Sequence, residues 1–366
     1  MSRARAQRFL YMVVARSRHP LQSNLYTVHR INPCSLFFPI KNYDDYAQRQ
    51  RAQSEPAAAA AAAEIKASLP PNPILTLYPS AGDLPMNFVL TGRGKDKIVA
   101  TDYLGRAFLY DDTLRAHHDE PKYDPVCLAT GDDLFVMSNP PESRGRSAEA
   151  LADQTDRLRR SELHWRPVPT PSFTKPQPGG GSDQAGFVVD AYTVVGGASV
   201  WLSVGRHGTY SVDMEKIAYG VHGNDICHGE WSKEGDWPLP FSGRAVYAPE
   251  RDLWFGFAAS DQTVLCAADL KQQQGRPPVA RHRWEGFGVP KEHCQAPVKS
   301  FLVHLGGTDG RFCVAKFSTD ADGHRTARLT GVEVSRCVDG KDLCAVKHKT
   351  YHYGGFGDDD CPVSLL

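Results

Sequence analysis

Four adjacent residues, His117-His118-Asp119-Glu120, have the side chains of a metal site. Imidazole nitrogens and carboxylate oxygens are common ligands of zinc. Adjacent residues of an extended chain point in opposite directions, so one ion cannot use all four side chains. The three aspartates at 358–360 lack the alternating ligands and the distal glutamate of a calcium loop. We therefore predict neither a metal ion nor any other cofactor.

Residue types for nucleophilic, phosphate-binding and acid-base chemistry also occur, but not in the settings that these reactions need. Ser199 and Ser203 lack the G-x-S-x-G context of a nucleophile elbow. Residues 92–96 (Gly-Arg-Gly-Lys-Asp) end on an aspartate where a phosphate loop has a hydroxyl, which favours a hairpin turn. Glu250 and Asp252 suit acid-base work only if a fold places them around a pocket, and a polar turn between strands is the simpler interpretation. The sequence therefore predicts no catalytic residue.

The nine cysteines form an odd set without a C-x-x-C pair. The spacing of Cys337, Cys344 and Cys361 matches no zinc pattern, so we expect buried or partly exposed thiols rather than ligands or a disulfide framework. None of the seven asparagines stands in an N-x-Ser/Thr acceptor. Both observations favour a reducing compartment, the cytoplasm or the nucleus.

Charge and hydropathy exclude some partner classes. The 42 basic and 42 acidic residues balance, so no overall field draws in nucleic acid or an anionic membrane. No apolar stretch approaches the length of about eighteen residues that a spanning helix needs. The apolar share of 41% is enough for a sizeable core. We expect a globular protein without a nucleic-acid or membrane partner.

The first 43 residues contain seven basic side chains and no acidic one. This bias is typical of an organellar transit peptide, which is one interpretation. The other interpretation is structural, because Phe9 to Ala15 and Leu25 to Ile31 have the pattern of strands separated by a polar turn. We favour the strands and keep an organellar location as the alternative.

An apolar strand, a turn and a second strand recur along the chain. The instances lie at 97–111, 194–213, 253–269 and 301–317. A spacing near fifty residues is typical of propeller blades, kelch repeats among them. The pattern therefore predicts an all-β protein with a kelch-like β-propeller of six or seven blades.

The predicted propeller is a single domain over residues 1–366, with its core at about 9–353. We expect the N-terminal strands to pair with a C-terminal strand around 345–353, because closure removes exposed sheet edges. Three segments are expected to lie outside the core, together with a flexible connection at 169–184. The segments are an alanine-rich low-complexity insertion at 47–71, a charged loop insertion at 144–160 and an acidic tail at 354–366.

The long connection from Met214 to Gly229 is the predicted partner-binding loop, because loops vary more freely than strands. The residues expected to contact a partner are His222, Asn224, Asp225 and His228. The aromatic residues around this loop are expected to pack in the core. They stand at positions 201, 210, 231, 237, 254, 255 and 257.

Several motifs resemble a plant family that is expanded in grasses and catalogued as a domain of unknown function, number sixteen-sixty-eight. The motifs are Gly208-Thr-Tyr-Ser-Val-Asp213, Trp231 to Phe241, Gly243-Arg244-Ala245, Leu253-Trp254-Phe255-Gly256 and Leu265 to Leu270. Members of that family look like kelch-type propellers. The resemblance implies one folded unit with a structural N-terminus, and it implies no catalytic residue, because the family has no established activity.

These observations favour a binding module that is not an enzyme and that recognises a protein through loops at one end of the propeller. A component of a ubiquitin ligase is one class of partner that this expectation includes. The alternative is a propeller enzyme or a carbohydrate-binding protein with a site in the central channel, since propellers also carry such sites. The sequence makes no prediction about the oligomeric state.

Overall fold

The computed structural model describes the following parts of the chain. They are residues 9–16, 25–39, 48, 63–67, 69–79, 85–91, 97–102, 106–109, 115–117, 122, 124–131, 133–141, 147–155, 161–174, 187–219, 227–271, 276–288, 299–320, 322–338, 340, 342–357 and 360–366. The chain divides into two compact units: unit 1 holds 1–82, 246–269 and 280–366, and unit 2 holds 83–245 and 270–279.

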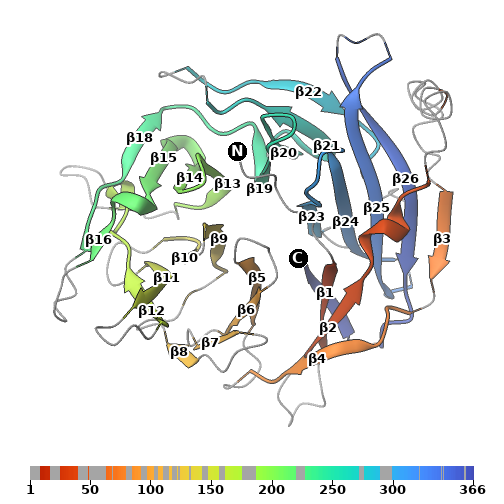
Figure 1. The fold of residues 1–366 in the computed structure, drawn as a ribbon, viewed down its shortest axis with the longest axis horizontal. Coiled ribbons are helices and arrows are strands. Elements are labelled where there is room, and N and C mark those ends of the chain that lie inside the picture. Colours follow the sequence, from red (N-terminus) through yellow and green to blue (C-terminus); the bar gives the residue numbers. More distant parts are fainter. Residues whose placement is uncertain are drawn as a thin grey trace. The chain divides into compact units, whose positions relative to one another are not determined.

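Unit 2 is built from antiparallel sheets in chain order (Figure 1). The first sheet has β5 (Asn87–Thr91), β6 (Lys97–Thr101), β7 (Arg106–Leu109) and β8 (Arg115–His117), and the second has β9 (Val126–Thr130), β10 (Asp133–Met137), β11 (Ala148–Thr155) and β12 (Ser161–Pro167). The third sheet has eight strands, and the first four in sheet order are β18 (Ser232–Gly235), β15 (Gly208–Asp213), β14 (Ser199–Val204) and β13 (Val189–Val195). β16 (Ala218–Tyr219) pairs separately with β17 (Cys227–His228). Short 3-10 helices are η2 (Ser172–Thr174), η3 (Gly205–His207) and η4 (Met214–Lys216).

Tight turns at glycine set the register of these sheets. β13 and β14 pair from Val195 and Ser199 inwards, and the turn between them holds Gly196 at φ 65° and Gly197 at φ 89°. Residues other than glycine rarely adopt such angles, so this pair permits the short hairpin. Four of the five residues of β10 are buried, which is the pattern of a strand covered on both faces.

Unit 1 contains the two chain ends and the C-terminal strands. One sheet has the order β27 (Asp360–Leu365), β1 (Leu10–Arg16), β2 (Leu25–Ile31) and β4 (Pro73–Leu77), and the 3-10 helix η1 (Pro33–Leu36) follows β2. A second run has β20 (Leu253–Ala258), β21 (Asp261–Ala268) and β22 (Ala280–Trp284). The five-stranded sheet has β23 (Lys299–His304), β24 (Arg311–Thr319), β25 (Arg325–Arg336), β26 (Leu343–Tyr353) and β3 (Ala63–Ala67).

Strand β19 (Phe241–Ala248) continues from one unit into the other. Its first part pairs in parallel with β13 in unit 2, and the strand order then runs on to β20. Antiparallel pairing dominates everywhere else, and only β3 on β26 is also parallel among the described pairs. The prediction of an all-β chain is therefore confirmed.

The C-terminal strand was predicted at the wrong place. β1 pairs with β27 and not with a strand at 345–353, which is β26 and pairs with β25. Tyr11 and Leu366 exchange two backbone hydrogen bonds of 3.0 Å. Residues 360–365 therefore extend the first sheet, and the segment from 354 is not simply an acidic tail.

Two predicted insertions also contain strands. Residues 148–155 form β11, and Leu151 is buried in the core with Leu134 and Val136 of β10. The expectation of a charged loop at 144–160 was wrong because the neighbouring strands β10 and β12 supply backbone partners on both sides. Residues 63–67 of the alanine-rich segment form β3, and the preceding alanines lie outside the described residues.

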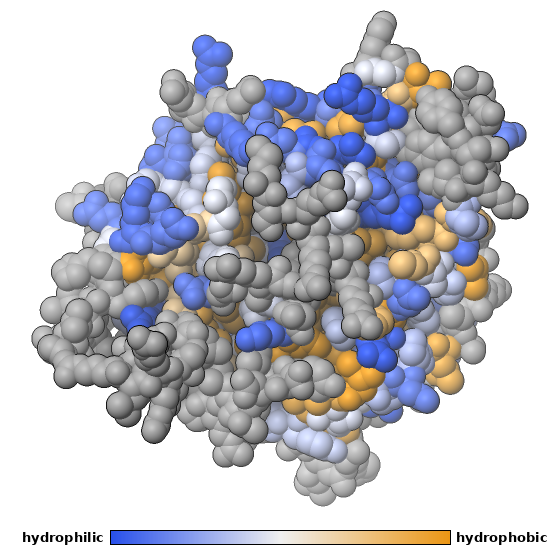
Figure 2. All heavy atoms as spheres, in the orientation of Figure 1, coloured by the Kyte–Doolittle hydropathy of each residue, from blue (hydrophilic) through white to orange (hydrophobic). Residues whose placement is uncertain are grey.

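The predicted core aromatics are confirmed. Trp201, Tyr210, Trp231, Trp237, Trp254, Phe255 and Phe257 are all buried. Exposed large apolar side chains are single residues such as Leu69, Tyr78 and Val279. On the face drawn in Figure 2, hydrophilic residues lie among smaller hydrophobic patches. The described residues contain no helix that is long and apolar enough to cross a membrane.

The cysteine prediction needs one correction. Cys337 and Cys344 form a disulfide across the hairpin between β25 and β26, with their Cα atoms 5.0 Å apart. The antiparallel hairpin brings the two residues together, so they form a disulfide and not the free thiols that their spacing had led us to expect. Cys266 and Cys313 are buried free thiols as expected, whereas Cys34 is exposed.

Candidate functional site

Tyr192 and Arg244 lie directly opposite each other in the parallel pair of β13 and β19. Their side chains therefore project from the same face of the sheet. This parallel strand pairing is short, because Ala191 and Gly243 are its one further registered pair. Beyond it, the Thr193 hydroxyl donates a hydrogen bond of 2.9 Å to the Ala245 carbonyl. Two strands more than fifty residues apart in sequence thus place a phenol beside a guanidinium.

Neither side chain of this pair has a hydrogen bond or ion pair with another residue in the described part of the chain. Arg244 is exposed and Tyr192 is half-buried. Desolvation by the surrounding protein lowers the pKa of Arg244, and the same effect raises the pKa of the Tyr192 phenol. Because the Arg244 side chain is exposed, a ligand can reach the guanidinium. Because protein surrounds it on several sides, fewer water molecules compete with that ligand, and the electrostatic interaction is stronger than in open solvent.

Cys127 and Asp124 lie within electrostatic reach of Tyr192. Burial raises the pKa of the Cys127 thiol to about 12, so the sulfur is protonated at neutral pH. It donates a weak hydrogen bond of 3.8 Å to the Pro125 carbonyl. Asp124 is exposed and carries the negative charge of this neighbourhood. The set therefore combines one cation, one neutral phenol, one neutral thiol and one carboxylate.

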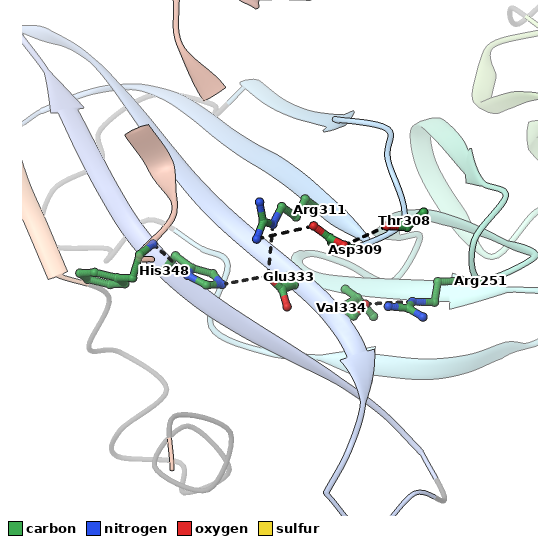
Figure 3. A network of polar contacts seen from close by, with 8 residues as sticks. Arg251, Thr308, Asp309, Arg311, Glu333, Val334 and His348 are labelled. Carbon is green, nitrogen blue, oxygen red and sulfur yellow. Dashed lines mark hydrogen bonds and ion pairs between the residues drawn. The ribbon is translucent and has the colours of Figure 1, made fainter. Parts of the chain in front are cut away.

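A larger polar network lies in unit 1, around Glu333 of β25 (Figure 3). The Glu333 carboxylate lies 3.3 Å from Nε of Arg311 and 3.6 Å from Nε2 of His348. The His348 side chain has no exposed surface, and that of Glu333 is 9% exposed. Arg311 also lies 3.7 Å from Asp309, whose carboxylate accepts a hydrogen bond from the Thr308 hydroxyl.

This network fastens the segment after η1 to the five-stranded sheet. The Phe38 backbone N–H donates to Nδ1 of His348 at 3.3 Å, which leaves Nε2 as the nitrogen that carries a proton toward Glu333. The Arg311 guanidinium stacks on the Phe37 ring at 4.8 Å, and the Phe37 and His348 rings lie 5.0 Å apart. These contacts join β24, β25 and β26 to the segment after η1, so the network holds the fold together.

Glu250 and His304 form a second buried pair in unit 1. The Glu250 carboxylate lies 2.8 Å from Nε2 of His304, and the two side chains are 9% and 4% exposed. Burial raises the pKa of Glu250, but the hydrogen bond and charge of His304 outweigh it, so the pKa is lowered overall. Asp252 instead bonds the Tyr247 hydroxyl within the turn between β19 and β20. The predicted polar turn is confirmed, and the two carboxylates do not converge.

The other residues weighed from the sequence have structural partners or lie outside the described residues. The buried Ser203 hydroxyl accepts a hydrogen bond of 3.1 Å from the Leu239 backbone, and Ser199 begins β14. β5 and β6 pair antiparallel on either side of 92–96, which lie outside the described residues. His117 ends β8, and 118–120 lie outside the described residues.

The predicted partner-binding residues lie between or on the strands β16 and β17. His228 belongs to β17, whereas His222, Asn224 and Asp225 fall outside the described residues. The connection that carries them is anchored at both ends, because Met214, Ile217 and Trp231 are buried in one core cluster. The Trp231 indole also donates a hydrogen bond of 2.7 Å to the Pro169 carbonyl.

An acidic cluster marks the hairpin between β24 and β25, where single ligand atoms of Asp320, Asp322 and His324 lie within 4.8 Å of one another. The Asp320 carboxylate already accepts backbone hydrogen bonds of 3.0 and 2.8 Å from residues 322 and 324. The cluster therefore closes the hairpin turn. At the C-terminus, Asp360 lies 3.6 Å from Arg16, and 358–359 lie outside the described residues.

Comparison with known families decides the classification. Residues 7–353 match the family described as "Protein of unknown function (DUF1668)". The chain belongs to this family. A search of the curated proteins finds no match. The DUF1668 match includes every strand described above from β1 to β26, and β27 follows it.

Sequence reasoning missed Tyr192 and the network around Glu333. The motif Gly243-Arg244-Ala245 was part of the resemblance to the DUF1668 family, and this was the one signal for Arg244. Tyr192 gives no such signal, because only the parallel pairing of β13 with β19 brings it to Arg244.

Proposed function

We propose that this member of the DUF1668 family is a six-bladed, kelch-like β-propeller that binds a protein partner and is not an enzyme. Sets of four antiparallel strands that follow one another in the chain support the propeller. These sets are β5 to β8, β9 to β12, β13 to β15 with β18, β19 to β22, β23 to β26, and β27 with β1, β2 and β4. The last set supports closure, because it unites both chain ends.

The connection between β15 and β18 is the observation that carries the binding role. A simple hairpin needs two to five residues here, whereas this connection runs from 214 to 231 and contains a small sheet of its own, β16 with β17. The buried anchors Met214, Ile217 and Trp231 hold its base. A base that is already fixed suits recognition, because these anchoring residues need not be ordered on binding.

Replacement of residues 218–228 by a short Gly-Ser linker tests this proposal, because it removes β16, β17 and the residues between them and leaves the three anchors in place. Affinity capture with the full-length protein should lose its reproducible partners, while the melting temperature stays within about 2 °C. The matched control replaces the turn 320–324 in unit 1 by Gly-Ser residues and should retain those partners. Capture that survives the 218–228 replacement contradicts the proposed role of this loop.

A further inference from the structure

Arg244 takes part in no ion pair with another described residue, unlike several lysines of unit 2. Lys122 and Glu149, both buried, form an ion pair of 2.6 Å in the same unit. Lys233 pairs with Asp236 at 2.5 Å, and Lys216 pairs with Asp213 at 3.0 Å. Carboxylates of unit 2 therefore pair with lysines at several places, and none of those that the structure describes pairs with Arg244.

Arg244 is chemically suited to hold an anion from outside the chain. A guanidinium keeps its charge at neutral pH and presents several N–H donors in a plane that matches the two oxygens of a carboxylate. Tyr192, opposite it in register, keeps its hydroxyl proton and adds a further donor on the same face. An anion placed here would replace the water that the surrounding protein partly excludes from the guanidinium.

We propose that Tyr192 and Arg244 bind a carboxylate, presented as the acidic side chain of a protein partner. One cation balances one negative charge, and Asp124 nearby repels a second one, so a carboxylate fits this site better than a phosphate dianion. The neutral Cys127 thiol and the Tyr192 ring offer contact to the short aliphatic part of a glutamate. The protein source of the carboxylate rests on the proposed function, whereas the site itself does not.

Arginine modification measures this binding on the full-length protein without a partner. Phenylglyoxal reacts with accessible arginines, and peptide mass spectrometry gives the rate at each position. N-acetyl-glutamate N-methylamide is the probe, N-acetyl-glutamine N-methylamide is its neutral control, and ionic strength is held constant. Arg276, which is exposed and belongs to the same unit, is the internal reference.

The acidic probe should slow modification of Arg244 on the order of tenfold near saturation and leave Arg276 unchanged, because a charge-assisted hydrogen bond must break first. Tyr192→Phe should raise the probe concentration that gives half protection on the order of fivefold. No protection, or equal protection by the neutral control, overturns the site. Stronger protection by inorganic phosphate overturns the carboxylate as its ligand.

This test separates the site from the loop. A protein with residues 218–228 replaced should keep the protection of Arg244, because the loop contributes neither side chain. Protection that disappears with the loop contradicts a site made by Tyr192 and Arg244. If the variant loses its partners but Arg244 stays protected, both the binding role of the loop and the carboxylate site are supported. If the variant keeps its partners and Arg244 stays protected, only the binding role of the loop is contradicted.

Discussion

The network around Glu333 and the Tyr192–Arg244 pair both contain an arginine beside another polar side chain, but only the arginine of the network has a carboxylate partner from the fold. Around Glu333 in unit 1, one carboxylate lies between an arginine and a buried histidine, and the histidine in turn accepts a backbone N–H. In unit 2, Arg244 has a phenol beside it and forms no ion pair with a described residue. A polar group whose partners all come from the fold contributes to stability, and one without such partners is available to a ligand.

The largest expected effect tests the stabilising half of this comparison. Glu333→Ala removes the carboxylate from a buried histidine and a partly buried arginine, so the free energy of unfolding should fall by about 3–5 kcal/mol. Urea denaturation measures it. Asp309→Ala is the matched control, because its side chain is 55% exposed and its contact with Arg311 should contribute less than about 1 kcal/mol. Equal losses in the two variants would contradict a structural role for Glu333.

An intermediate effect concerns a buried cation whose partners are neutral. The Lys316 ammonium donates hydrogen bonds of 2.8 Å to the Gln262 carbonyl and the Ser300 hydroxyl, and it lies 3.8 Å from the centre of the Phe257 ring. Burial lowers its pKa from 10.5 to about 8. Between these two values the unfolded chain holds a proton that the folded chain lacks, so stability rises with pH.

Unfolding at pH 7.5 and 9.5 measures this contribution. From pH 7.5 to 9.5, the free energy of unfolding of the wild-type protein should rise by about 1–2 kcal/mol more than that of Lys316→Met, which has no amine to titrate. Lys299→Met, at an exposed position in β23, should behave like the wild type. The same pH dependence in wild type and Lys316→Met would show that the lysine titrates normally.

The smallest expected effect tests the other half of the comparison. Arg244→Gln removes a charge that has no partner in the fold, so the free energy of unfolding should change by less than about 0.5 kcal/mol. Thermal and urea denaturation measure this change, with Glu333→Ala measured under the same conditions for comparison. A loss above about 1 kcal/mol would mean that Arg244 belongs to the supporting structure.

The sequence predicts strands well where apolar and β-branched residues dominate. The expected strand at 25–31 coincides with β2, and the strand around 253–257 coincides with β20. β11 was missed because alanine, glutamate and leucine favour helices, and pairing with β10 and β12 overrides that preference. β27 was missed because it follows an acidic run and contains Pro362.

The candidate site was less predictable than the fold. Tyr192 and Arg244 meet through a parallel pair of two registered residues, and local sequence patterns carry no information on such a contact. Glu333 and His348 were hidden for a similar reason, since the backbone partner of His348 is Phe38, which follows η1 near the other end of the chain. Glu250 was noted for its neighbour Asp252, whereas its actual partner is His304.

The pairing of β1 with β27 sets the earliest time at which the first sheet of unit 1 can be completed. β1 is translated long before its hydrogen-bonding partner at 360–366, because almost the whole described chain lies between them. At a translation rate of roughly 5 to 20 residues per second, the edge of β1 waits on the order of 20 to 70 seconds for that partner. During this interval one edge of an apolar strand lacks its partner, which is when we expect the nascent chain to depend most on chaperones.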